Sequence, residues 1–274
     1  MSNGSDQTPS RLITEAVMRV LGEGAIAVLT TLIEAPRSVG AKLLIEESSA
    51  RVGSLGDSAL DEAVAQYAPI FLESRAEARA FRVTELAREL EAWGEARVLF
   101  ERIEPEPHLV ICGAGHVGAS LARLTRLIGY RTTLIDDRAD FVTRARFPEQ
   151  EIELVAAENW TTAVQKVIGK GRGVFVAVVT RGHNEDEECM RAVMATRPDY
   201  VGLIGSKRRT NIVLGRLREG GVDEALLREV RAPVGLDIGA VSPEEVALAI
   251  LAEIVAVRRG GTGKPLSTWR RKND

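Results

Sequence analysis

The sequence predicts an α/β protein in which a smaller α+β domain precedes a Rossmann-like domain with a doubly wound parallel sheet. Beyond residue 108, short and nearly continuous runs of Val, Ile and Leu alternate with helical segments, which is typical of parallel strands covered by helices on both faces. A glycine motif follows the first run and opens a helix, as in dinucleotide-binding folds. Pro105 and Pro107 precede that run, and such a proline pair favours an extended linker.

The N-terminal half predicts a mixed unit of helices and strands. Apolar residues recur at helical spacing until Gly22, where the first helix is expected to end. Asp57 is expected to cap the second helix, because its side chain can accept hydrogen bonds from the free amides of the first turn. The predicted elements are a helix over residues 11–21, strands over 25–33 and 41–45, a helix over 57–71 and a strand over 97–103.

The C-terminal half predicts five parallel strands with helices between them. The last helix, with its apolar body over residues 246–257, opens at Ser242, which forms a capping box with Glu245. The predicted strands cover residues 109–112, 132–136, 152–155, 174–180 and 200–205, and the helix after the first strand covers 119–128. We therefore expect domains over residues 11–104 and 108–259, with flexible tails over residues 1–10 and 260–274.

Composition and charge narrow the classes of function. The 274 residues are 45% apolar and carry a formal net charge of −3, so we expect a compact protein with neither nucleic acid nor a membrane surface as partner. We also expect a cytoplasmic protein, because no apolar run is long enough to span a bilayer and the start has no apolar signal core. The two cysteines, Cys112 and Cys189, form no CxxC pair, so we expect no metal site.

The turn after the strand at residues 109–112 is the predicted phosphate-binding element. Gly113 permits the tight turn, Gly115 lets the backbone approach a phosphate, and Gly118 lets the helix pack against the strand. The free amides at the start of this helix suit an anion. The alternative is a scaffold that has kept its glycines and lost its ligand. The predicted cofactor-binding residues of the turn are Gly113, Ala114, Gly115, His116, Val117 and Gly118.

Asp136, Asp137 and Arg138 follow the next strand, about 20 residues downstream, where an acidic side chain of such folds meets a ribose hydroxyl. The aspartates favour a ribose, whereas Arg138 favours an additional phosphate. The identity of the ligand therefore stays open at this point.

Two more loops follow strands at the same edge of the sheet, and we expect both to lie near the glycine turn, because strand carboxyl ends form the ligand crevice. His183 and Asp186 are the candidates for a catalytic role. The alternatives are a solvated histidine, a helix cap and a charged first helical turn. The predicted binding residues of these loops are Thr180, Arg181, His183, Gly205, Ser206 and Lys207.

Two segments are candidates for completing the site. Arg37 lies in a turn of the N-terminal domain, where its guanidinium could bind a phosphate or carboxylate across the domain interface. A solvent-exposed arginine is the alternative. The apolar loop over residues 232–239 is expected to pack over the cleft.

Taken in order, these motifs make the sequence resemble the XdhC/CoxI family, the accessory and maturation proteins of xanthine and carbon monoxide dehydrogenases. The resemblance covers both domains. The segments that carry it lie at residues 36–42, 112–118, 136–138, 146–148, 180–183, 200–207 and 232–239.

The resemblance implies a chaperone rather than an enzyme. Such a protein binds molybdenum cofactor, as molybdopterin or its dinucleotide form, protects it while its sulfido ligand is installed, and delivers it to a molybdenum hydroxylase. It further implies a homodimer, with a cysteine desulfurase as an additional partner. Many family members carry cysteines where this chain has residues 56–58 and 93–94, which contain none. Ligation of molybdenum by an N-domain thiolate is therefore not expected.

Two other functions stay open. An NAD(P)-dependent oxidoreductase would need a proton donor or acceptor beside the nicotinamide, and His183 and His116 are the residues placed to serve. A non-catalytic regulatory module would keep the Rossmann domain only as a vestigial scaffold.

Overall fold

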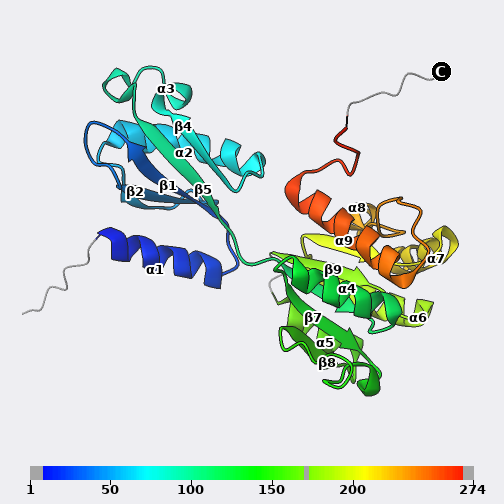
Figure 1. The fold of residues 1–274 in the computed structure, drawn as a ribbon. Helices are drawn as coiled ribbons and strands as arrows, with labels where there is room; N and C mark the ends of the chain where they lie inside the picture. The colour runs from blue at the N-terminus through cyan, green and yellow to red at the C-terminus, as the bar shows by residue number, and fades with distance from the viewer. Residues whose placement is uncertain (1–8, 170–172, 268–274) are drawn as a thin grey trace, which may run out of the picture. The chain divides into compact units, whose positions relative to one another are not determined.

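The computed structural model describes residues 9–169 and 173–267. The chain divides into two compact units, and the division falls between Pro105 and Glu106. Each unit has its own sheet, and each is described by itself (Figure 1).

The first unit is an antiparallel sheet with a helix on each face. Its elements are α1 (Pro9–Gly22), β1 (Ala27–Glu34), β2 (Lys42–Glu46), β3 (Arg51–Ser54), α2 (Ser58–Glu73), β4 (Ala78–Arg82), α3 (Val83–Leu86), η1 (Glu91–Trp93) and β5 (Arg97–Ile103). The strand order is β3-β2-β1-β5-β4, and all neighbours are antiparallel. Leu43 and Ile45 pack on the α2 side, whereas Leu44 between them packs on the α1 side, so the two helices cover opposite faces (Figure 1).

Local sequence signals explain most of this unit. Asp57 caps α2 as predicted, since its carboxylate accepts hydrogen bonds from the amides of Ala59 and Leu60 at 3.0 and 3.1 Å. β5 has the predicted bounds, and α1 begins at Pro9, two residues before its predicted start. β3, β4 and α3 were not predicted.

The second unit is a five-stranded parallel sheet. Its elements are β6 (His108–Cys112), α4 (His116–Leu127), β7 (Arg131–Asp136), η2 (Ala139–Phe141), β8 (Ile152–Ala156), α5 (Trp160–Ile168), β9 (Val174–Val178), α6 (His183–Thr196), β10 (Tyr200–Leu203), α7 (Lys207–Glu219), α8 (Glu224–Glu229) and α9 (Pro243–Arg259). The strand order is β10-β9-β6-β7-β8. The chain runs from β6 outward to β8 and then returns to β9 on the other side of β6, so the topological switch point lies between β6 and β9.

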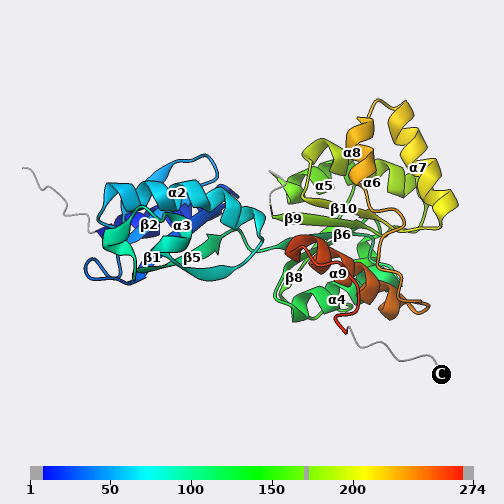
Figure 2. The same ribbon diagram turned by 90° about the horizontal axis from the view of Figure 1, so that it is seen from above.

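Helices cover both faces of this sheet, which confirms the doubly wound Rossmann-like fold. Leu109 and Ile111 pack with α4 and α9, and Val110 and Cys112 pack with α5 and α6. Figure 2 shows the two pairs of helices on opposite sides of the sheet. Every residue of β6 and β9 is buried, which explains why their sequences are almost continuously apolar.

Several boundaries differ from the predicted ones. β9 ends at Val178 and β10 at Leu203, two residues before the predicted ends. α4 begins at His116, three residues earlier than predicted, because its first turn is part of the glycine motif. Residues 1–8 and 268–274, which belong to the predicted tails, lie outside the described residues. Among the described residues, no helix is long and apolar enough to cross a membrane.

Candidate functional site

The glycine turn follows β6 at the switch point and lies directly against the end of β9. The amide of Val179 donates a 2.8 Å hydrogen bond to the carbonyl oxygen of Cys112. Gly113 has a φ of +118°, and a Cβ there would lie 2.5 Å from the carbonyl oxygen of Val179. Gly113 is therefore required both by its backbone conformation and by the close approach of the two loops.

Gly118 and Gly115 differ in what surrounds them. A Cβ on Gly118 would lie 1.8 Å from the carbonyl oxygen of Gly113, so α4 approaches the end of β6 too closely for a side chain. A Cβ on Gly115 would meet no atom within 4 Å. Gly115 is the N-cap of α4 and provides no side chain to cap it. The start of α4 thus has no side-chain cap, and the space where a Gly115 side chain would lie is open, an arrangement that suits an anion at a helix N-terminus.

α6 begins beside this turn and also has a glycine N-cap, Gly182, without a side-chain cap. The Thr180 hydroxyl donates to the carboxylate of Asp186 at 2.6 Å, and Arg209 Nε donates to the same carboxylate at 2.7 Å. Burial raises the pKa of Asp186 despite these two partners. Asp186 is fully buried, so its carboxylate does not face an open cleft. Its hydrogen bonds instead position Thr180 and Arg209.

The buried carboxylate of Asp136 connects the glycine turn to the loop after β7 through hydrogen bonds. Its carboxylate accepts a 2.6 Å hydrogen bond from the amide of Ala114 and 2.9 Å bonds from the backbone amide, Nε and Nη2 of Arg138. The guanidinium of Arg138 also lies 3.6 Å from the ring centre of Phe141. The guanidinium of Arg146 lies 4.4 Å from the same ring centre. With these donors in place, the carboxylate of Asp136 is already occupied on both oxygens.

Asp137 pairs instead with Arg181, from the loop after β9. The two guanidinium nitrogens lie 2.6 and 2.8 Å from the two carboxylate oxygens, and Arg181 also lies 3.0 Å from Glu185. Arg181 lowers the pKa of Asp137 through these hydrogen bonds. Because β6 lies between β7 and β9, a pair that joins the loops after β7 and β9 crosses the carboxyl end of β6.

The two aspartate pairs differ in how readily they can open. The side chains of Asp136 and Arg138 are 2% and 33% exposed, so the carboxylate of this pair is buried, and leaving a buried charge without its partner is costly. The side chains of Asp137 and Arg181 are 27% and 44% exposed, and exposed pairs contribute about 0–1 kcal/mol. Arg181 is therefore the cation that can change partners, whereas Arg138 is held in place.

The comparisons with known proteins match both halves of the chain. The model of the XdhC Rossmann domain matches residues 109–254, and the model of the XdhC and CoxI family matches residues 20–84. The chain belongs to the XdhC and CoxI family.

Three curated proteins resemble this XdhC and CoxI family member over part of their length. The chain is 30% identical over 162 residues to a probable xanthine dehydrogenase subunit from Bacillus subtilis, covering 59% of this chain and 46% of that protein. It is 33% identical over 84 residues to the molybdenum cofactor insertion chaperone PaoD of Escherichia coli, covering 30% of this chain and 26% of that protein. The uncharacterized Escherichia coli protein YqeB is 33% identical over 157 residues, which cover 57% of this chain and 28% of that protein. The chain thus spans less than half the length of each relative.

A solved structure supports the fold of the family member. A protein from Bacillus halodurans described as a xanthine dehydrogenase superposes with a TM-score of 0.66 at 20% identity, covering 91% of this chain and 67% of that one. At this identity the likeness establishes the shared fold.

The remaining predicted residues lie in less enclosed positions. His116 and His183, the first residues of α4 and α6, are not buried. Ser206 caps α7 by accepting a 3.3 Å hydrogen bond from the amide of Arg209, and Lys207 after it is exposed. Gly205, Ser206 and Lys207 follow β10, which β9 separates from β6. The geometry therefore brings the residues after β9 directly to the glycine turn, and for those after β10 it gives no such contact within the described residues.

Arg37 belongs to a cluster within the first unit. Its guanidinium lies 4.8 Å from the ring centre of Trp93 and 3.6 Å from the carboxylate of Asp57. A backbone hydrogen bond from Leu60, the largest contribution, and a side-chain hydrogen bond from Trp93 lower the pKa of Asp57. Asp57 and Trp93 belong to the two segments, residues 56–58 and 93–94, in which the resemblance implies cysteines in many family members. The fold brings these places together, here with an ion pair and an aromatic ring in place of thiols.

Sequence reasoning missed the residues that hold the site together. Arg209 lies in a run of three basic residues, and the sequence gives no sign of which one turns inward. Phe141 and Arg146 stack beside the glycine turn, where Arg146 Nη2 donates a 3.5 Å hydrogen bond to the carbonyl oxygen of Ala114. The only signal for Arg146 is that it lies in one of the family-like segments.

The apolar loop over residues 232–239 runs beside β10 and α9. The amide of Val234 donates to the carbonyl oxygen of Leu203, and the amide of Gly235 donates to the carboxylate of Glu253 in α9. No described contact places this loop over the glycine turn, so its predicted role as a cover stays a prediction.

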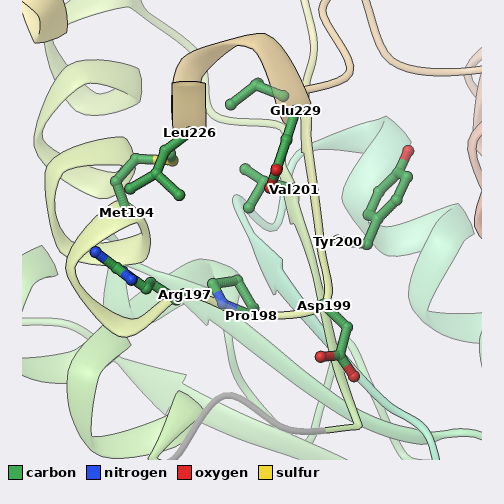
Figure 3. A pocket seen from close by; sticks show the side chains of 9 residues that line it. Met194, Arg197, Pro198, Asp199, Tyr200, Val201, Leu226 and Glu229 are labelled. Atoms are coloured by element: carbon green, nitrogen blue, oxygen red, sulfur yellow. The ribbon is translucent and has the colours of Figure 1, made fainter. Parts of the chain in front are cut away.

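Two hollows lie away from the glycine turn. One, of about 60 Å³, lies at the amino end of β10 between α6 and α8, and Met194, Val201 and Leu226 form its apolar wall. Figure 3 shows the ring of Tyr200 on the other side of β10 from Met194 and Leu226. The second is an open groove of about 440 Å³ between α4 and α9, lined by Ser120, Arg123, Leu124, Glu244, Glu245 and Leu248. Neither hollow includes a residue of the glycine turn.

Proposed function

We propose that this protein is a maturation factor for a molybdenum hydroxylase of the xanthine or carbon monoxide dehydrogenase type. In this proposal it binds molybdenum cofactor, or a related ligand with a phosphate, at the glycine turn and delivers it to the client enzyme. The relationship to a molybdenum cofactor insertion chaperone and to a probable xanthine dehydrogenase component supports this role. The observation that carries it is the start of α4 at Gly115, which has no side-chain cap and has open space where a Gly115 Cβ would lie.

The chain's own residues fit the phosphate end of the cofactor. Amides at Gly115, His116 and Val117 can donate to phosphate oxygens, and the positive end of the helix dipole favours the anion. Arg181, the exposed cation beside the turn, can add a charge-assisted hydrogen bond. When bound, the cofactor supplies the molybdenum and pterin chemistry.

The two cysteines of the chain are not placed to bind molybdenum. Cys112 and Cys189 are both fully buried, and burial, together with contact with Cys112, raises the pKa of Cys189. Both thiols are therefore enclosed in the core, out of reach of a bound metal. We accordingly propose that a separate cysteine desulfurase supplies sulfur to the bound cofactor. We also propose that the protein acts in the cytoplasm and as a homodimer.

Cofactor retention by the full chain tests the proposal. Molybdenum cofactor released from a purified molybdoenzyme is mixed anaerobically with the protein, and molybdenum is measured in the protein peak after gel filtration. Gly115→Ala places a methyl group where the phosphate would lie without touching any protein atom, so we expect at least about tenfold less retention. Gly215→Ala is the matched control, because its Cβ also meets nothing within 4 Å, and it should retain cofactor like the wild type. Equal retention by both variants would refute the proposed site.

The geometry does not favour the nicotinamide alternative. Asp136, which would receive the ribose hydroxyls of a dinucleotide, is buried and already bonded to Ala114 and Arg138. NADH fluorescence titration tests this interpretation, and we expect affinity weaker than for molybdenum cofactor. A vestigial module is equally disfavoured, because the space above Gly115 is open rather than filled by a side chain.

A further inference from the structure

We infer that the glycine turn selects a ligand that ends in a single phosphate over one that continues into a second nucleotide. This inference rests on the proposed function and specifies its ligand as the mononucleotide-like pterin phosphate. In a Rossmann fold, a dinucleotide lies with its pyrophosphate over the glycine turn and its second nucleoside beyond it, on the side of the next strand. In this chain that side is β7, and two aspartate pairs occupy its end.

The first obstacle is Asp136. It ends β7, where a ribose acceptor would stand, yet it is buried and accepts hydrogen bonds from Ala114 and Arg138. A ribose could bind there only if Arg138 left. Arg138 is fixed twice, by the carboxylate and by stacking on Phe141 at 3.6 Å. For the same reason Arg138 is not free to receive a ribose 2′-phosphate.

The second obstacle is the pair of Asp137 with Arg181. It joins the loops on either side of the glycine turn at 2.6 and 2.8 Å, so it crosses the line along which a dinucleotide runs from β9 to β7. A second nucleotide must displace it. A terminal phosphate need not, because it can rest on the amides of α4 without passing to the β7 side.

A terminal phosphate is also a better partner for Arg181 than a pyrophosphate bridge is. It carries more charge on one group than either phosphate of a pyrophosphate bridge, and its free oxygens can accept from the α4 amides and from Arg181 together. Asp137 and Glu185 are the carboxylates that hold Arg181 beside the turn. Asp137 therefore acts as a specificity-determining residue that keeps Arg181 across the path to β7.

Two parallel binding titrations test this assignment. The full chain is titrated anaerobically with molybdopterin and, separately, with molybdopterin cytosine dinucleotide, which share the pterin and differ by the added nucleotide. We expect the wild type to bind molybdopterin at least about tenfold more tightly. Asp137→Asn removes one of the two carboxylates that hold Arg181, so the affinity for the dinucleotide should rise and the ratio should fall. The ratio should stay above one, because Arg138 remains bonded to Asp136.

Glu187→Gln is the matched control for the loss of one carboxylate charge. Glu187 pairs with Arg191 and Arg216 at 2.8 and 3.2 Å, further along α6, and its change should leave the ratio as in the wild type. Equal affinity of the wild type for the two forms, or a ratio that Asp137→Asn does not change, overturns the inference and leaves the proposed function standing. If neither form binds the wild type, the proposed function fails and this inference fails with it.

Discussion

The amide of Ala114 in the glycine turn donates a 2.6 Å hydrogen bond to the buried carboxylate of Asp136 at the end of β7. This bond fixes the turn to the neighbouring strand. The guanidinium of Arg138 donates two further hydrogen bonds to the same carboxylate. The turn is therefore positioned by a charged group that is shielded from solvent.

Asp136→Asn should destabilise the second unit by about 3 kcal/mol, because Arg138 and the Ala114 amide lose a buried anionic partner. Urea denaturation followed by circular dichroism measures this. Asp140→Asn, an exposed carboxylate in the same loop, should stay within about 0.5 kcal/mol of the wild type. A similar loss of stability in both variants would contradict a specific stabilising role for the buried carboxylate of Asp136.

Gly118→Ala should be destabilising for a steric reason. Its Cβ would lie 1.8 Å from the carbonyl oxygen of Gly113, so α4 has to move away from β6 at a cost of about 3 kcal/mol. Gly215→Ala adds the same methyl group to α7 without a contact and should be neutral or stabilising. The free energies of unfolding of the two variants are compared directly, and equal values would contradict the close approach.

His108 predicts a dependence of stability on pH. Burial lowers the pKa of His108 from 6.5 to about 4 in the folded protein, where its Nε2 lies 2.8 Å from the Thr133 hydroxyl. The unfolded chain binds this proton below its pKa of about 6.5 and the folded protein does not. Stability should therefore fall as the pH drops from about 6.5 to 4, by about 3 kcal/mol in all.

His108→Gln checks this assignment, since an amide can keep the bond to Thr133 and does not titrate. His116 and His183 lie outside the core and stay in both proteins. The difference in unfolding free energy between variant and wild type should change across this pH range in favour of the variant at low pH. Parallel pH profiles would contradict a lowered pKa.

The second unit could be predicted well from the sequence because its signals are local. β6 and β9 are buried on both faces, so their apolar runs are visible without knowledge of the fold. β3 and β4 were missed because they are edge strands with mostly exposed side chains. They form by pairing with β2 and β5, which a local pattern does not encode.

The candidate site also contains residues that the sequence predicts and contacts that it does not. Gly113, Gly115 and Gly118 are recognisable from their spacing, since each meets a backbone requirement of the turn. The pair of Asp137 with Arg181 joins residues 44 positions apart and depends on which strands flank β6. The hydrogen bond between Asp186 and Arg209 likewise depends on α7 lying beside α6. Such contacts follow from topology, so composition and spacing could not predict them.

In the proposed function, the first amides of α4 hold the phosphate of molybdenum cofactor. Amide chemical shifts of the isotope-labelled full chain, recorded during anaerobic titration with molybdopterin, test this most directly. We expect the largest shifts at Gly115, His116 and Val117, and we expect Gly115→Ala to remove them. Saturable binding with these amides unmoved would contradict the proposed site.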